Sequence, residues 1–444
     1  MLRHASPGVA IAARPMGVGV RVRERVFAFG RRPALLTLLV AILAVILTIS
    51  RRPDSIFRAQ FWAEDGQVWY AEAYNQGWLR MALTPHTGYF QTVSRLAAAL
   101  SLPVGLAYAP LVYNVIALAL QVLPAILLVT RRMERAIPDV RIRLLLALIY
   151  IGVPNSYELD ANITNAMTHL ALIAALIVFS EPGRHTLWKV HDVFFMLLAG
   201  LSGPFMIVLF PLAVIKAALR RQRWGVVLAG IAGVCASVQL LAFLTTGAAT
   251  RPRPPLGASL HNFISVIAGQ VFTANLVGMN HYNDIFNSPS WQHGLPRKVI
   301  FALGAAAVLY AFIRGNLELR LMVIFAFGLL CAALATPVIS YTQDNWPLLA
   351  HPRGGDRYWV IPGLAFDACL VWILCRSRFP PARLAATAAI LVLLGFGMLG
   401  DWRYTPYVDL HPDHYASVFE EAPRGSFVVI PINPPPWHID LYKK

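Results

Sequence analysis

Long apolar runs separated by short polar connections are the feature that most limits how this 444-residue chain can fold. A transmembrane helix needs about 20 mainly apolar residues, and only helices and closed barrels satisfy their backbone hydrogen bonds inside a bilayer. The fraction of charged residues is 14%, far below the roughly 25% of a soluble domain, and the deficit extends along the whole chain. The sequence therefore predicts an all-α polytopic membrane protein. Roughly eleven spans are expected, over 33–50, 104–130, 143–154, 163–180, 190–201, 204–219, 225–247, 298–313, 321–340, 358–375 and 384–400.

The distribution of charge predicts how these spans are oriented. Six basic clusters, one before the first span and five between later spans, hold most of the 38 Lys and Arg residues, and they alternate with longer, more acidic connections. Because basic residues are retained on the cytoplasmic side, we expect the N-terminus inside and the C-terminus outside an inner (plasma) membrane. Arg51 and Arg52, directly after the first span, are an exception to this pattern. The net charge of +16 is distributed over these clusters and forms no continuous basic face, which argues against a nucleic-acid partner.

The chain is predicted to consist of a basic cytoplasmic segment, a helical bundle with two large outer loops, and a short outer tail. The tail is too small to form a core of its own, so we expect it to lie on the outer face of the bundle. Met16 is a second candidate start besides Met1. The four cysteines lie in or beside apolar spans and lack the spacing of a disulfide framework or a metal site. The parts cover 1–32, 33–400 with outer loops 51–103 and 248–297, and 401–444.

The two outer loops nearest the N-terminus each carry a pair of acids. Glu64 and Asp65 stand in the first loop among tryptophans and tyrosines at helical spacing, which is typical of a helix at the membrane surface. Asp65 could simply cap that helix. Glu158 and Asp160 stand in the second loop, where an ordinary N-cap would also explain an acid.

Polar residues continue from the second outer loop into the fourth span. Asn162 and His169 lie at helical spacing with Asn165 between them, so the three share one face of a helix. Polar side chains inside a span normally face the bundle interior or a watery cavity. Two acids within predicted spans, Asp192 and Asp367, have no partner that the sequence identifies.

A third polar cluster precedes the tenth span. His351, Arg353 and Arg357 stand there beside two adjacent glycines. Arginines and a histidine held by glycines at the rim of a span suit a phosphate group, and a salt-bridged interfacial loop is the alternative interpretation. All three clusters belong to the predicted outer face. Acids, a cationic site and a membrane on one face suit sugar transfer from a lipid-linked donor, in which a carboxylate takes the proton of the acceptor hydroxyl and cations stabilise the leaving phosphate.

With this multispan bundle, the adjacent acids Glu64 and Asp65, the Glu-x-Asp of the second outer loop and the arginine-bearing loop before a late span, the chain resembles the GT-C superfamily of membrane glycosyltransferases. The resemblance covers the whole architecture but rests on short motifs. It implies that Asp65 is the catalytic base, with Glu64 as the second candidate, and that transfer inverts the anomeric centre. The acidic motif of the second loop, here Glu158 and Asp160, binds a divalent metal (Mg or Mn) in one branch of the superfamily, whereas many relatives work without metal.

The expected donor is a polyprenyl-phosphate-linked sugar, and the expected acceptor is a glycan, lipid or protein of the cell envelope. An O-antigen polymerase or ligase stays open as an alternative, because the outer loop 248–297 contains the arginines and histidines that such an enzyme would use. A lipid-linked-sugar flippase or transporter is a third possibility, but it would place polar residues near the midplane of the bilayer. The residues predicted to bind substrate or phosphate are Arg353, Arg357, His351, Asn162 and His169.

Overall fold

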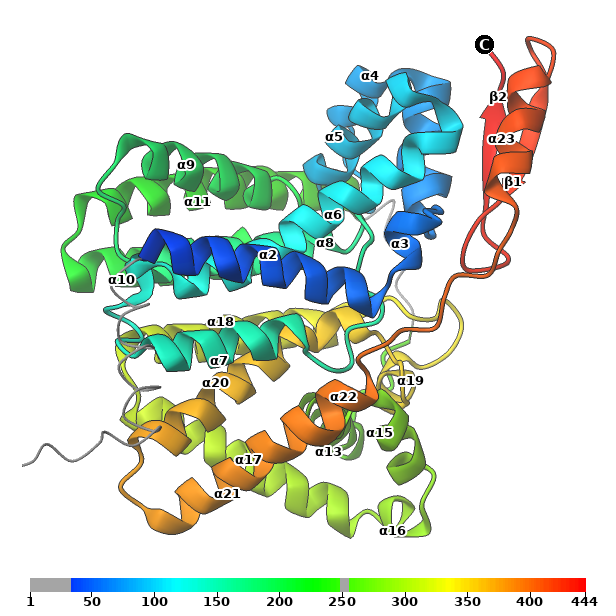
Figure 1. The fold of residues 1–444 in the computed structure, drawn as a ribbon. Coiled ribbons are helices and arrows are strands. Elements are labelled where there is room, and N and C mark those ends of the chain that lie inside the picture. Colours follow the sequence, from blue (N-terminus) through cyan, green and yellow to red (C-terminus); the bar gives the residue numbers. More distant parts are fainter. Residues whose placement is uncertain (1–32, 248–254) are drawn as a thin grey trace, which may run out of the picture.

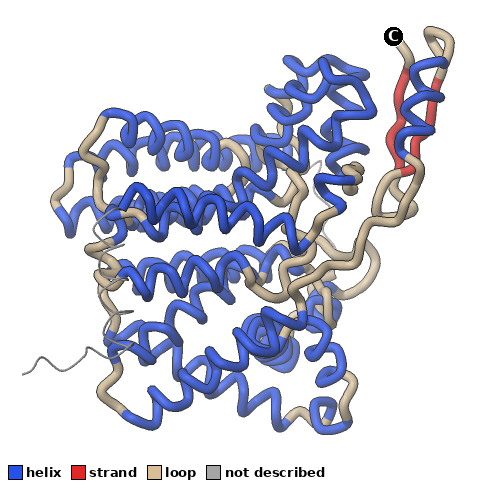
Figure 2. Tube along the Cα trace, viewed as in Figure 1, coloured by secondary structure: helices blue, strands red, loops and turns tan. Residues whose placement is uncertain are grey.

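The computed structural model describes residues 33–247 and 255–444, and most of them are helical. Long helices lie side by side in a bundle, while a two-stranded sheet lies at one end (Figures 1 and 2). In these two ranges, seven helices are long and apolar enough to cross a membrane, which confirms the prediction of a helical multi-pass membrane protein. They cover Ala34–Arg51, Thr92–Val129, Arg223–Gly247, Leu260–Val277, Leu295–Arg314, Leu317–Ala335 and Pro380–Gly400.

Each apolar stretch predicted as a span coincides with one helix of the bundle, but several of these helices are short. α7, for example, has 12 residues and α8 has 14, fewer than the roughly 20 that a straight span requires. The bundle helices are α2 (Pro33–Arg51), α6 (Gly105–Val129), α7 (Val140–Ile151), α8 (Ala166–Phe179), α9 (Thr186–Gly200), α10 (Met206–Arg220), α11 (Arg223–Ala242), α17 (Leu295–Arg314), α18 (Leu317–Ala335), α20 (Val360–Arg376) and α21 (Pro380–Val392).

The predicted outer loop 248–297 differs from expectation, because it contains a long apolar helical stretch. α13 (Leu260–Val266), η6 (Ile267–Ala274) and α14 (Asn275–Val277) follow one another without interruption. Their mean hydropathy of 1.3 is the lowest of the seven candidate spans, since polar residues such as Gln270 interrupt the apolar run. Gln270 is itself completely buried, where it donates to the backbone carbonyls of residues 349 and 351. Its partners lie far away in the sequence, so hydropathy alone did not reveal this helix.

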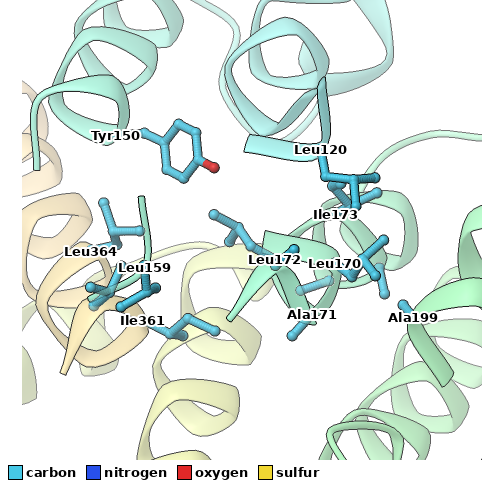
Figure 3. Close-up of a cluster of buried hydrophobic side chains, with 14 of the residues drawn as sticks. Leu120, Tyr150, Leu159, Leu170, Ala171, Leu172, Ile173, Ala199, Ile361 and Leu364 are labelled. Atoms are coloured by element: carbon cyan, nitrogen blue, oxygen red, sulfur yellow. The ribbon is translucent and has the colours of Figure 1, made fainter. Parts of the chain in front are cut away.

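Helix α8 occupies the centre of the bundle. All of its residues except Met167 are buried, and α6, α9, α10 and α18 pack around it. Figure 3 shows Leu170, Leu172 and Ile173 among buried side chains from α6, α7, α9 and α20. A helix that is apolar on every side is stable only when other helices surround it. By contrast, only 17% of the α2 span and 11% of the α17 span are buried, as expected for helices that face lipid.

The two ends of the bundle differ in complexity. Short connections join α6 to α7, α10 to α11, α17 to α18 and α20 to α21 at the end where α2 begins, on the left in Figure 1, which we call the plain end. The opposite end, which we call the elaborated end, carries α3 (Asp54–Phe57), α4 (Trp78–Ala82), α19 (Asn345–Ala350) and the C-terminal sheet. The segments predicted to lie inside therefore share one end, and those predicted to lie outside share the other.

The shorter elements are η2 (Ala73–Gly77), α5 (Thr92–Ser101), η3 (Leu102–Val104), η4 (Arg131–Met133), η5 (Phe243–Gly247), α15 (Met279–Phe286), α16 (Pro289–Gln292), η7 (Asp356–Tyr358), η8 (Leu393–Gly397) and α22 (Met398–Gly400).

The C-terminal tail packs against the first outer loop. It contains α23 (Pro412–Glu421) and an antiparallel hairpin of β1 (Phe427–Pro431) and β2 (His438–Tyr442). Ile432 and Ile439 lie against Gly66 in η1 (Asp65–Tyr70), so closely that a Cβ on Gly66 would stand 2.7 Å from Ile439 Cδ1. Glycine therefore permits the hairpin to rest directly on the helix that follows the first acidic pair.

Both acids for which the sequence offered no partner are paired. Near the plain end, Arg132 donates to the two carboxylate oxygens of Asp192 at 2.7 and 2.8 Å. Trp224 Nε1 donates to the same carboxylate at 3.1 Å, and Asp192 is completely buried. Asp367 in α20 accepts a hydrogen bond from Asn275 Nδ2 at 2.7 Å. These polar groups join helices of the bundle, which explains why they are tolerated within apolar segments.

Candidate functional site

Acids and arginines from three separate loops come together at the elaborated end. Glu64 lies within electrostatic reach of both Glu158 and Arg357, and Arg357 forms an ion pair with Glu158. Asp356 adds a further acid close to Glu158 and Arg353. We call these five residues the outer cluster. The sequence predicted four of them, and the structure brings them together.

Asp65 is bound by the backbone of the second outer loop. Its carboxylate accepts hydrogen bonds from the N–H groups of Ile163 at 3.0 Å and Thr164 at 2.9 Å, and from Thr164 Oγ1 at 2.6 Å. Trp69 Nε1 donates to the same hydroxyl at 2.8 Å. Burial raises the pKa of Asp65 to about 7, although these hydrogen bonds act in the opposite direction. Asp65 therefore fastens two loops together and does not cap its own helix.

Glu64 differs from its neighbour because its side chain is half-buried and faces the outer cluster. Within the described ranges, no other residue holds the Glu64 carboxylate by a hydrogen bond or an ion pair. Burial raises its pKa, and the nearby Arg357 opposes that increase. A carboxylate whose pKa is raised is a stronger base and can accept a proton from a reacting hydroxyl group. Glu64 is thus the acid of the pair that is available for proton transfer.

The two acids of the second outer loop point toward different arginines. Glu158 pairs with Arg357, whereas the buried Asp160 lies 3.5 Å from Arg51 Nη1. Gln121 also donates to the Asp160 carboxylate. Among the residues that the structure describes, no group of three or more His, Cys, Asp or Glu side chains could hold a metal ion. Because each acid already binds an arginine, the pair does not fit the Mg or Mn site that the resemblance implied.

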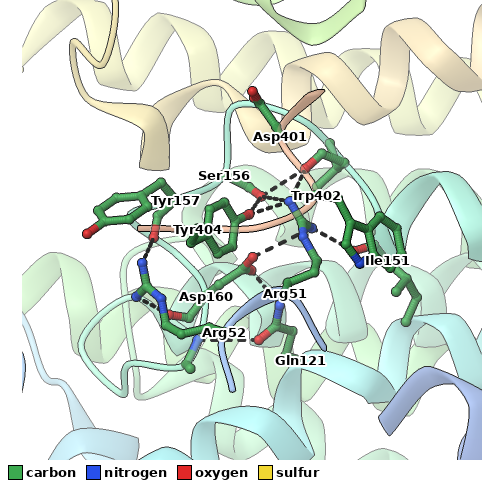
Figure 4. Close-up of polar contacts among 12 residues, drawn as sticks. Arg51, Arg52, Gln121, Ile151, Ser156, Tyr157, Asp160, Asp401, Trp402 and Tyr404 are labelled. Carbon is green, nitrogen blue, oxygen red and sulfur yellow. Dashed lines mark hydrogen bonds and ion pairs between the residues drawn. The ribbon is translucent and has the colours of Figure 1, made fainter. Parts of the chain in front are cut away.

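Arg51 and Arg52, the exception to the predicted charge pattern, are structural residues. Arg51 donates to the carbonyl of Ile151 at 2.6 Å, and its guanidinium lies 4.7 Å from the centre of the Tyr404 ring. Arg52 donates to the Asp160 carbonyl and to a tyrosine hydroxyl of the tail, both at 3.1 Å. Figure 4 shows how this buried network joins the end of α2, the second outer loop and the tail. Such a role explains why two arginines follow the first span on its outer side.

Arg353 is the exposed arginine of the outer cluster. Its guanidinium lies 5.6 Å from the centre of the Tyr157 ring, and no acid forms an ion pair with it in the part of the chain that the structure describes. Arg353 and Arg403 line a small pocket whose walls also include Tyr157, Tyr404 and Asp356. Two arginines and two aromatic rings around a pocket can bind a phosphate group and a sugar ring.

Three of the predicted binding residues lie outside the outer cluster. His351 is exposed. Asn162 is buried and donates to the backbone carbonyl of Glu158 at 2.6 Å, so it shapes the second outer loop. His169 lies inside α8 with Nδ1 2.9 Å from the Tyr150 hydroxyl. The contacts of Asn162 and His169 are those of structural residues, and a role for the three in binding stays a prediction.

Two residues that the sequence did not single out position the acidic pair. Thr164 binds Asp65, and Asn433 of the tail binds the segment that precedes Glu64. The Ala63 N–H donates to the Asn433 carbonyl at 2.6 Å, and the Asn433 side chain is buried. Ala63 has a φ of +45°, a left-handed conformation that needs support from its surroundings. The residues next to Asn433 in the sequence do not indicate that it lies beside the first outer loop. The one sequence feature that could have drawn attention to it is a polar residue directly before a run of prolines.

The pH dependence of stability should report on the buried acids. Burial raises the pKa of Asp356 to about 8 and that of Asp65 to about 7. Between about pH 4 and pH 8 the folded state therefore holds protons that the unfolded chain has released, and stability falls as the pH rises. We expect Asp356→Asn to reduce this fall, and the exposed Asp284→Asn to leave it unchanged. Melting temperatures measured from pH 5 to pH 9 test this, and an equally steep fall in Asp356→Asn would contradict it.

Comparison of the sequence with models of protein families and with curated proteins gives no match. The fold defines a multi-pass helical membrane protein.

Proposed function

We propose that this protein is a membrane glycosyltransferase that moves a sugar from a polyprenyl-phosphate donor to a cell-envelope acceptor at the elaborated end of the bundle. The outer cluster is the observation that supports this proposal. Three loops that are distant in sequence meet there, and they supply an available acid, Glu64, and an exposed arginine, Arg353. In this proposal the bundle is GT-C-like and its eleven bundle helices cross the membrane, with residues beside the shorter helices completing their spans; the helical stretch 260–277 is not counted as a crossing.

Glu64 acts as the base in this reaction. It takes the proton of the acceptor hydroxyl while that oxygen attacks the anomeric carbon from the face opposite the phosphate, so the configuration is inverted. The bond from the anomeric carbon to the phosphate oxygen breaks, and the polyprenyl phosphate leaves with its electron pair. Arg353 and Arg403 stabilise the negative charge on that phosphate. Asp65, the base predicted from the sequence, instead holds residues 163–164 in place, because its oxygens already accept three hydrogen bonds.

The surface of the elaborated end suits a donor that is anchored in lipid. Trp78, Leu79 and Leu83, in and just after α4, are exposed by 47%, 62% and 73%. Tryptophan and leucine on a short surface helix are typical of contact with the interfacial region of a bilayer. The charge pattern assigns this end to the outside of the cell, where a sugar donor carried by a lipid would be used.

Purified protein in lipid nanodiscs, supplied with a radiolabelled polyprenyl-phosphate sugar and a cell-envelope extract, tests the proposal. We expect label to move to the acceptor, and Arg353→Ala to raise the KM for the donor about tenfold, because a hydrogen bond to a charged phosphate is lost. Arg424→Ala, which removes an exposed arginine of the tail outside the outer cluster, should leave KM unchanged. Binding of the donor without transfer would contradict the proposal and favour a flippase.

A further inference from the structure

A second group of arginines surrounds a cavity at the plain end, opposite the outer cluster. The open cavity has a volume of about 540 Å³. Arg141 from the start of α7, Arg376 from the end of α20 and Arg383 from the first turn of α21 line it. Asp139 is the acid in its wall, and the Asp139 carboxylate accepts a hydrogen bond from the backbone N–H of Arg141 at 2.9 Å. Among the described residues that line the cavity, arginines outnumber acids even when Arg141 is left aside, so this part of the wall has an excess of positive charge.

The remaining walls of this cavity are apolar and continue onto the outer surface of the bundle. Ile142 and Leu145 of α7 face it together with Leu374 of α20. Leu148, one turn after Leu145, is 41% exposed, and Leu384 at the start of α21 is 73% exposed. In a helix that crosses a bilayer, exposed leucines of this kind contact lipid chains. A cationic cavity at the head of an apolar surface matches the two chemical parts of an anionic phospholipid.

We infer that this cavity binds the headgroup of an anionic phospholipid, with the acyl chains lying along α7 and α21. Arg376 and Arg383 are both exposed, and neither side chain forms an ion pair within the described ranges, so both can bind a phosphate. The charge pattern assigns the plain end to the cytoplasmic side, where anionic lipids give the leaflet a negative surface potential. The site lies at the other end of the bundle from the outer cluster and does not depend on the proposed reaction.

Native mass spectrometry of the full chain in detergent, with phosphatidylglycerol or phosphatidylcholine of identical chains added, tests this inference. We expect the wild type to retain phosphatidylglycerol in preference to phosphatidylcholine. The double variant Arg376→Ala/Arg383→Ala should bind phosphatidylglycerol about 30-fold more weakly, because each arginine contributes to the attraction of an anionic headgroup. Arg378→Ala is the matched control, since Arg378 is exposed on the same connection but does not line the cavity.

A second variant keeps the test valid if the double alanine variant fails to fold. Arg376→Lys/Arg383→Lys retains both charges and should keep most of the binding, and phosphatidylglycerol should still raise its melting temperature. Equal retention of phosphatidylglycerol by wild type and the alanine variant would overturn the site. If inorganic phosphate displaced the lipid and stabilised the protein equally well, the cavity would be a site for a soluble anion, and the lipid assignment would be wrong.

Discussion

Replacing Glu64 by glutamine is expected to lower sugar transfer by about 10²- to 10⁴-fold, the range that loss of a general base produces. Glutamine keeps the size of the side chain but cannot take the proton of the acceptor hydroxyl. The structural cost should be small, because the Glu64 carboxylate has no hydrogen bond or ion pair with another described residue. The melting temperature of Glu64→Gln should therefore stay close to that of the wild type. Initial transfer rates at saturating donor, measured in nanodiscs, give the effect on activity.

Asp65→Asn is the matched control, and it should lower the stability of the fold more than it lowers the rate of sugar transfer. Three donors point at the Asp65 carboxylate, and an amide offers one acceptor atom where the carboxylate offers two. A buried donor left without an acceptor costs about 1–3 kcal/mol, so unfolding should occur at a lower temperature. Rates corrected for the folded fraction should fall less than those of Glu64→Gln. A stable but inactive Asp65→Asn beside an active Glu64→Gln would reverse the two roles and restore Asp65 as the base.

Asp192→Ala is expected to lower the free energy of unfolding by about 3–5 kcal/mol, the usual cost of removing one partner of a buried ion pair. Arg132 would then lose both short contacts to that carboxylate and keep a buried charge with a single carbonyl partner at residue 181. The double variant Arg132→Met/Asp192→Leu should recover most of the loss, because it leaves no unpaired charge in the apolar interior. Denaturant unfolding of the protein in mild detergent measures both variants.

The surface pair of Arg135 and Glu181 provides the comparison for this experiment. The closest atoms of these two side chains lie 3.4 Å apart, but Arg135 is half-exposed, and exposed pairs contribute at most about 1 kcal/mol. Arg135→Ala should therefore change the unfolding free energy little. If Asp192→Ala were no more destabilising than Arg135→Ala, water would have to reach the ion pair of Arg132 and Asp192. That result would contradict the complete burial of Asp192.

Hydropathy located the helices of the bundle because the preference of a segment for lipid is a local property of its residues. The same measure failed for the helix that contains Gln270, whose polarity is satisfied by carbonyls about 80 positions away. The acids and arginines of the outer cluster were visible for a similar local reason, since they are charged residues beside apolar spans. The prediction that these acids and arginines lie close together depended on the expectation that the outer loops of one bundle meet at the same end of it, as they do in Figure 1.

The sequence could not distinguish the roles of two adjacent acids. Asp65 and Glu64 differ because the backbone of residues 163 and 164 reaches only the first of them. Similarly, the resemblance left open a metal shared by the two acids of the Glu-x-Asp motif, whereas Asp160 turns inward to Arg51, a residue that looked like an exception to the charge pattern. In each case the outcome depends on a contact between distant segments, which neither composition nor spacing contains.

The hydrogen bond from Asn433 to Gln60 joins residues 373 positions apart, and this separation matters for how the protein is made. Glu64 and Asp65 leave the ribosome long before the tail that supports the preceding turn at Ala63. A chain inserted into the membrane as it is synthesised therefore carries its acids for most of that time without the tail residue that binds the turn before them. The proposed transferase site would be finished only after residue 433 has been made, so chains that stop before this residue should lack transfer activity.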